Sequence, residues 1–104
     1  MRFLLEDTLA CELAEMIKSD FDYNARTGYR PFSYEFEFEQ NELIAVEGSL
    51  DYIVAYEEDV NYSFISFASV DIDFIKVYNN NGEEVKCPYN VSKVEEFLKN
   101  YLTE

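Results

Sequence analysis

Strict two-residue alternation dominates the middle of the chain. Within Phe32–Glu39 every second residue is aromatic, and the residues between are Ser33 and three glutamates. A strand sends alternate side chains to opposite faces, whereas a helix would mix the two sets, so a strand with one aromatic and one acidic face is predicted. The alternation resumes over Ile44–Tyr56, which predicts an antiparallel partner joined by a turn at 40–42. Gly48 indicates a bulge or a bend in that long partner.

A third long strand is predicted from about Tyr62 to Tyr78, because this segment is β-branched and aromatic throughout. Asp71 and Asp73 share one of its faces, and Val70, Ile72 and Phe74 share the other. The alternation slips after Phe74, at Ile75, which predicts a bulge or a bend there.

The run Asn79–Gly82 predicts a tight turn, because Asn and Gly tolerate positive φ. The chain is then expected to return over Glu83–Cys87 as a short edge strand that ends at Pro88. Between the first helix and the first strand, residues 19–31 lack a period and contain Gly28 and Pro31, so a connecting loop is predicted.

Two segments near the ends carry helical spacing. Apolar residues recur every three or four positions within Leu5–Lys18, which predicts an amphipathic helix with core packing as its default role. Near the C-terminal end, Ser92 and Glu95 fit a capping box, and an apolar stripe follows that predicts a second helix.

The predicted elements make one α+β domain over residues 1–104, in the order α-β-β-β-β-α. Successive antiparallel strands form a four-stranded meander, and both helices are expected on its aromatic face. The residues expected to share one core are Leu13, Ile17, Tyr34, Phe36, Phe38, Val46, Leu50, Tyr52, Phe97 and Leu98.

Composition agrees with one folded domain and restricts its partners. The 104 residues are 48% hydrophobic and 17% aromatic, and the formal net charge is −14. Such a charge repels nucleic acid and anionic membrane, so no direct binding to either is predicted and an attracted partner should be basic. The apolar run Phe3–Leu5 is broken by Glu6 and Asp7, and Cys11 and Cys87 lie in no metal or redox motif. A cytoplasmic protein with reduced cysteines is predicted.

The sequence lacks the residues of most common catalytic sites. It has no histidine, which removes histidine-based triads and zinc sites, and no pair of glycines has the spacing of a nucleotide-binding loop. A non-enzyme with no catalytic residue, cofactor or metal site is therefore predicted. Two alternatives stay open at this point: paired carboxylates acting as in a glycosidase, and calcium bound at Asp71 with Asp73 or at residues 57–59.

The distribution of charge points to one surface. Between Arg30 and Lys76 there is no basic residue, yet residues 31–75 carry eleven carboxylates. Alternate residues of a strand lie about 6.6–6.8 Å apart on one face, so a strongly negative sheet face is predicted. A second candidate surface is the loop carrying Tyr23, Arg26, Tyr29 and Arg30. The residues predicted to bind a partner are Glu35, Glu37, Glu39, Glu47, Asp51, Asp71 and Asp73.

In acidic composition and element order, the chain resembles small phage or mobile-element proteins of the anti-CRISPR and antirestriction type. The resemblance rests on layout, assigns no role to any residue, and implies an inhibitor of a nucleic-acid enzyme. The function predicted is a non-enzymatic binding protein that presents an acidic face to a basic protein partner, in one form as a nucleic-acid mimic. The alternative is a small structural or assembly protein that self-associates. An apolar patch left uncovered by the helices would favour the alternative.

Overall fold

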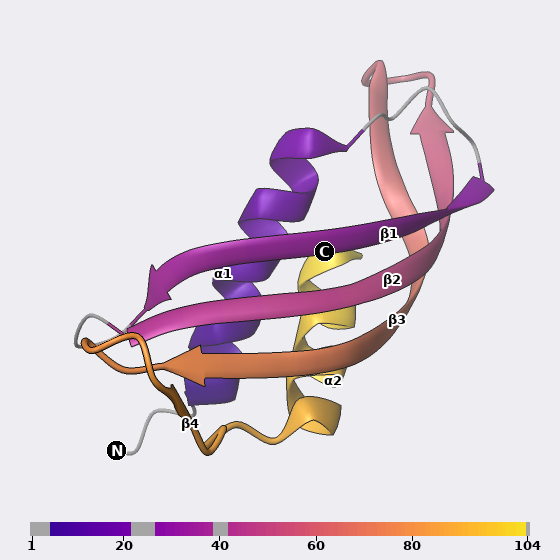
Figure 1. The fold of residues 1–104 in the computed structure, drawn as a ribbon. Coiled ribbons are helices and arrows are strands. Elements are labelled where there is room, and N and C mark those ends of the chain that lie inside the picture. The colour runs from indigo at the N-terminus through magenta and orange to yellow at the C-terminus, as the bar shows by residue number, and fades with distance from the viewer. Residues whose placement is uncertain (1–4, 22–26, 39–41, 104) are drawn as a thin grey trace, which may run out of the picture.

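A computed structural model describes residues 5–21, 27–38 and 42–103. Four strands form one antiparallel sheet in the order β1-β2-β3-β4, and two helices pack behind one face of it (Figure 1). This is the predicted α+β meander. The elements are α1 (Leu5–Asp20), β1 (Thr27–Phe38), β2 (Glu42–Glu57), β3 (Tyr62–Tyr78), β4 (Glu84–Val85) and α2 (Val91–Leu102).

Strand β1 begins five residues before the predicted strand, so the loop prediction is wrong for residues 27–31. The alternation simply continues backwards, with Tyr29 exposed and its neighbours more enclosed. Pro31 does not stop the strand, because in the described sheet β1 pairs with β2 alone and an edge strand tolerates a missing N–H. Gly28 fits here because a Cβ at this position would lie 2.7 Å from the hydroxyl oxygen of Tyr52.

The bulge in β3 lies at Asp73, two residues before the predicted position at Ile75. Glu47 pairs with Phe74 but Gly48 pairs with Ile72, so Asp73 is the extra residue. Phe74 therefore joins the face opposite to Ile72, and the prediction that both share a face is wrong. Gly48 does mark the irregularity, as predicted: a Cβ there would lie 2.5 Å from the backbone oxygen of Asp71.

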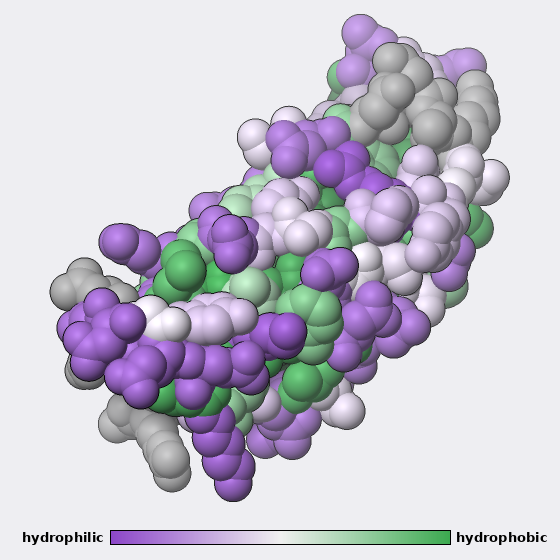
Figure 2. Space-filling view, viewed as in Figure 1, coloured by the Kyte–Doolittle hydropathy of each residue, from purple (hydrophilic) through white to green (hydrophobic). Residues whose placement is uncertain are grey.

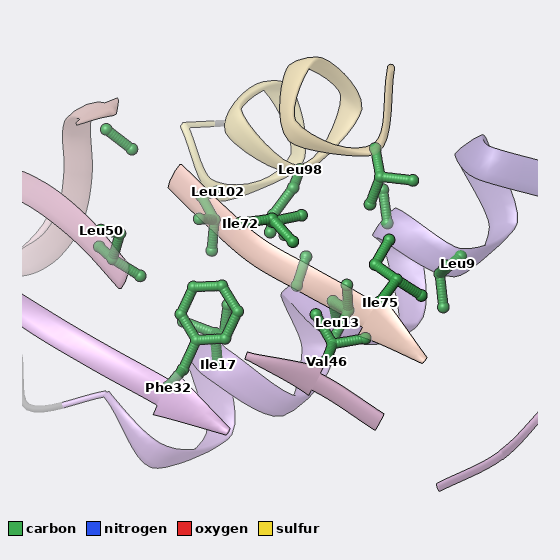
Figure 3. Packing of buried hydrophobic residues seen from close by; sticks show 14 of the residues in the cluster. Leu9, Leu13, Ile17, Phe32, Val46, Leu50, Ile72, Ile75, Leu98 and Leu102 are labelled. Carbon is green, nitrogen blue, oxygen red and sulfur yellow. The ribbon is translucent and has the colours of Figure 1, made fainter. Parts of the chain in front are cut away.

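The core lies between the sheet and the two helices (Figure 3). All ten residues predicted to share a core belong to this cluster or pack against it, which confirms the predicted faces of β1, β2 and the two helices. Tyr34, Phe36, Tyr52 and Phe97 are only half-buried in it. The largest fully buried side chains are Leu9, Leu13, Ile17, Ile44, Val46, Leu50, Ile65, Val77, Val94, Leu98 and Leu102.

Helix α2 starts earlier than predicted, and the capping box at Ser92 is wrong. The N-cap is Asn90, whose side chain accepts a hydrogen bond from the Lys93 N–H at 3.2 Å. The turn before β4 is confirmed, with Gly82 at φ 81° and the Asn79 side chain accepting hydrogen bonds from two backbone N–H groups.

The two helices, which come from opposite ends of the chain, lie side by side (Figure 1). The Asn90 N–H donates to Glu6 Oε2 at 3.0 Å, and the Tyr101 hydroxyl donates to Asp7 Oδ1. Neither helix of the described chain has the length and apolarity needed to cross a membrane.

Candidate protein-binding face

Strands β1, β2 and β3 turn one face away from both helices, toward the viewer in Figure 1. We call this the outer face. Along each strand, residues that face the core alternate with residues of the outer face. The alternation in the sequence therefore places one set of side chains in the core and the other set on this surface. Its members are the odd-numbered residues 27–37 and 43–57, together with Tyr62, Phe64, Phe67, Ser69, Asp71, Phe74, Lys76 and Tyr78.

Five of the seven predicted partner-binding residues lie together on the outer face, and all five are exposed. They are Glu35, Glu37, Glu47, Asp51 and Asp71. Asp73 is also exposed but sits at the bulge, outside the regular alternation. Glu39 lies outside the described residues.

The register sets how these carboxylates are arranged. Glu35 lies across Ala45 from Lys76, and Glu47 lies between Ser33 and Phe74. Lys76 is the one basic residue on the outer face as far as the structure describes it, and its Nζ lies 4.7 Å from the centroid of the Phe74 ring. The negative field of the face is therefore offset at a single point.

Two adjoining hollows mark the end of the outer face nearest the Asn79–Gly82 turn. One, of about 330 Å³, is lined by Ser33, Glu35, Ala45, Val46, Glu47, Phe74, Lys76 and Tyr78. The other, of about 520 Å³, is lined by Glu35, Glu37, Leu43, Tyr78, Asn79, Asn80 and Gly82. Apolar and aromatic side chains thus interrupt the acidic ones, and Figure 2 shows hydrophilic and hydrophobic residues interspersed over this view.

Exposed apolar side chains gather at the opposite end of the outer face. Ile53 pairs with Phe67, and Tyr29 lies in the neighbouring row, opposite Asp51. Their exposed fractions are 44%, 46% and 66% respectively. The alternation in the sequence predicts Ile53 on this face. It does not predict Phe67 there, because a second register shift lies between Ile53 and Val54 and no glycine marks it.

The second candidate surface is divided by the sheet. Tyr29 is on the outer face, whereas Arg30 is half-buried on the helix side, where its Nη1 donates to the Asp20 carbonyl at 2.9 Å. This places a cation at the C-terminal end of α1, where the helix dipole favours it. Tyr29 and Arg30 therefore do not form one surface, and Tyr23 and Arg26 lie outside the described residues.

Nearby Tyr34 completes this contact on the helix side. Its hydroxyl donates to Asp20 Oδ2 at 3.4 Å. Burial raises the pKa of the Tyr34 hydroxyl above its ordinary value of 10.0, against the opposing effect of Arg30. These groups hold α1 against β1, a structural role.

Over the described residues, no three or more Cys, Asp or Glu side chains come close enough to hold a metal ion. The arrangement of the outer face suits contact with another macromolecule, because it is broad, shallow and charged. No protein-family model matches the chain, and neither the curated proteins nor the solved structures contain a significant match.

Proposed function

We propose that this chain is a non-enzymatic binding protein whose outer face receives a basic protein partner. One observation carries the proposal: neither helix covers the outer face, and Lys76 alone opposes its exposed carboxylates there among the described residues. Unpaired surface carboxylates on a rigid sheet attract a positively charged partner over a distance and speed its encounter.

A narrower form of the proposal is a nucleic-acid mimic. Glu35 and Glu37 stand two residues apart on one strand, about 6.6–6.8 Å along it. Regularly spaced negative charge of this kind can occupy the Lys and Arg side chains with which a protein binds phosphates. The narrower form predicts that this protein displaces double-stranded DNA from a basic DNA-binding domain, which a fluorescence competition assay measures.

The broader form is tested with an oligolysine peptide as the probe. Backbone amide shifts on titration should concentrate on β1, β2 and β3. The triple variant Glu35→Gln, Glu37→Gln, Glu47→Gln should bind more weakly and with a flatter salt dependence, because fewer charges take part. The matched control is Glu12→Gln, Glu15→Gln, Glu96→Gln, which removes three exposed charges from the helices. Equal losses in both variants would show that net charge alone binds the peptide.

Self-association is a second candidate function, favoured by the exposed apolar pair Ile53 and Phe67. Against it, two copies that met through the outer face would bring Asp51 and Asp71 of one copy close to those of the other, in a chain of net charge −14. We expect sedimentation equilibrium to show a monomer at physiological salt. A dimer that Ile53→Thr dissociates would favour self-association instead.

A further inference from the structure

The hairpin of β2 and β3 extends past the rest of the sheet. Strand β1 starts at Thr27, opposite Ile53, whereas the pairing of β2 with β3 continues to Glu57 and Tyr62. We call residues 53–67 the arm. Beyond Ile53 it is a ribbon of two strands in the described sheet, and Figure 1 shows it projecting from the layered body.

The outer side of the arm carries a group of apolar side chains that do not contribute to the core. Phe67 and Ile53 are nearly half exposed, and Tyr62 stacks on Phe64 with ring centroids 5.9 Å apart. None of these four side chains belongs to the core or packs against it. Two-stranded ribbons are marginally stable alone, and grouped exposed apolar residues mark interaction sites.

Carboxylates surround this apolar surface on two sides. Asp51 and Asp71 lie on the outer face toward the body, and Glu57–Asp59 forms the tip of the arm. Among the described residues, the one basic side chain of the outer face is Lys76, which lies opposite Ala45 and far from the arm. An occupant that fits must therefore place apolar side chains at the centre and positive charge at the margins. The arm of a second copy offers the first but not the second, because residues 53–67 contain no Lys or Arg.

We propose that the arm is the main contact site for the basic partner, and that it takes an amphipathic polypeptide segment in which apolar residues are flanked by Lys or Arg. The apolar side chains of the segment dock on Ile53 and Phe67 of the arm and on Tyr29 of β1 beside it. Its cations face Glu57 of the arm and the neighbouring Asp51 and Asp71. This inference rests on the proposed function and gives the apolar residues and the carboxylates of the site different roles in binding. Buried aromatic contacts set how long a complex lasts, whereas rim charges mainly set how fast it forms.

Two synthetic peptides of equal length and charge test the proposal: one alternates Lys with Leu, the other Lys with Ser. Isothermal titration calorimetry should show the Lys-Leu peptide binding on the order of tenfold more tightly or better, because it buries apolar side chains. The variants Ile53→Thr and Phe67→Thr should reduce its affinity toward that of the Lys-Ser peptide. Val85→Thr, which alters an exposed apolar residue of β4, is the matched control. Circular dichroism checks that each variant is folded.

The outcomes separate this inference from the proposed function. If both peptides bind equally and only the Glu35, Glu37 and Glu47 triple variant weakens them, the arm proposal is overturned and the binding face stands. If neither peptide binds, both are overturned. If the protein is a dimer that Phe67→Thr dissociates, the arm belongs to a second copy and the proposal is again overturned.

Discussion

The side-chain carboxylate of Glu95 on α2 accepts a hydrogen bond from the backbone N–H of Ile72 on β3, with 2.6 Å between Oε2 and N. Strand β4 pairs with β3 only at Val77 and Tyr78, so at Ile72 the described sheet has β2 on one side of β3 and no strand on the other. The helix thus supplies a hydrogen-bond acceptor at the edge of the sheet, beside the bulge at Asp73.

We expect Glu95→Ala to lower the free energy of unfolding by about 1–3 kcal/mol, the usual cost of a part-buried donor left unsatisfied. Glu95→Gln should cost less, because the amide oxygen still accepts. Glu96→Ala removes an exposed neighbouring glutamate and serves as control. Urea unfolding gives the energies, and hydrogen exchange at the Ile72 amide should accelerate in Glu95→Ala alone. Equal stability of the two alanine variants would contradict the role given to Glu95.

Gly48→Ala should destabilise the fold by about 1–3 kcal/mol, the range for an overpacked core. The added methyl group would meet the backbone of β3 at Asp71 and Ile72, which cannot rotate away as a side chain does. Ser49→Ala, one residue on and directed to the outer face, should change stability little. Thermal unfolding of both variants provides the measurement, and an unchanged melting temperature for Gly48→Ala would count against the bulge as described.

Tyr34 should make stability depend on pH at the alkaline end. Its pKa is raised in the folded state, mainly by burial, so the folded protein holds the proton more tightly than the unfolded chain. The stabilising contribution is therefore full below about pH 10 and is lost as pH rises through the folded pKa. Tyr34→Phe should lose less stability over this range than the parent. Tyr29→Phe is the control, and the difference in phenolate absorbance between the parent and Tyr34→Phe separates the titration of Tyr34 from that of the other eight tyrosines.

Salt should stabilise the protein. With 22 acidic and 8 basic residues, the folded chain repels itself, and added salt screens that repulsion. We expect the melting temperature to rise between low and physiological ionic strength. The triple Gln variant of Glu35, Glu37 and Glu47 should melt higher at low salt and respond less to added salt. A melting temperature that falls with salt would show that attractive ion pairs dominate instead.

The faces of β1 were predictable because aromatic and acidic residues alternate without a break over Phe32–Glu39, and burial in β1 follows that alternation. The bulge at Asp73 was displaced in the prediction because Phe74 and Ile75 are both apolar, so either could face the core. The cap was assigned to Ser92 because it precedes Glu95 by three residues, but Asn90 is an equally good acceptor and Glu95 is engaged by β3.

The site was less predictable than the fold. Sequence spacing placed Glu35, Glu37, Glu47, Asp51 and Asp71 on one face, and the structure has them there. The position of Phe67 on that face depends on the register shift between Ile53 and Val54, which no local pattern reveals. The exposed apolar group at this end of the face also depends on β1 starting opposite Ile53, a tertiary fact that leaves the part of the arm beyond Ile53 with two strands in the described sheet.

The hydrogen bond from the Asn90 N–H to Glu6 joins residues 84 positions apart, so it can form only late in the synthesis of this domain. During synthesis α1 emerges before α2, so Leu9, Leu13 and Ile17 are made before the helix that lies beside α1. Helix α2 follows the five other described elements along the chain, and until it emerges the apolar side of α1 stays incompletely covered. Folding of this domain can therefore finish only after Leu102 has left the ribosome. Until then the nascent chain exposes apolar side chains of α1, the kind of surface that chaperones bind.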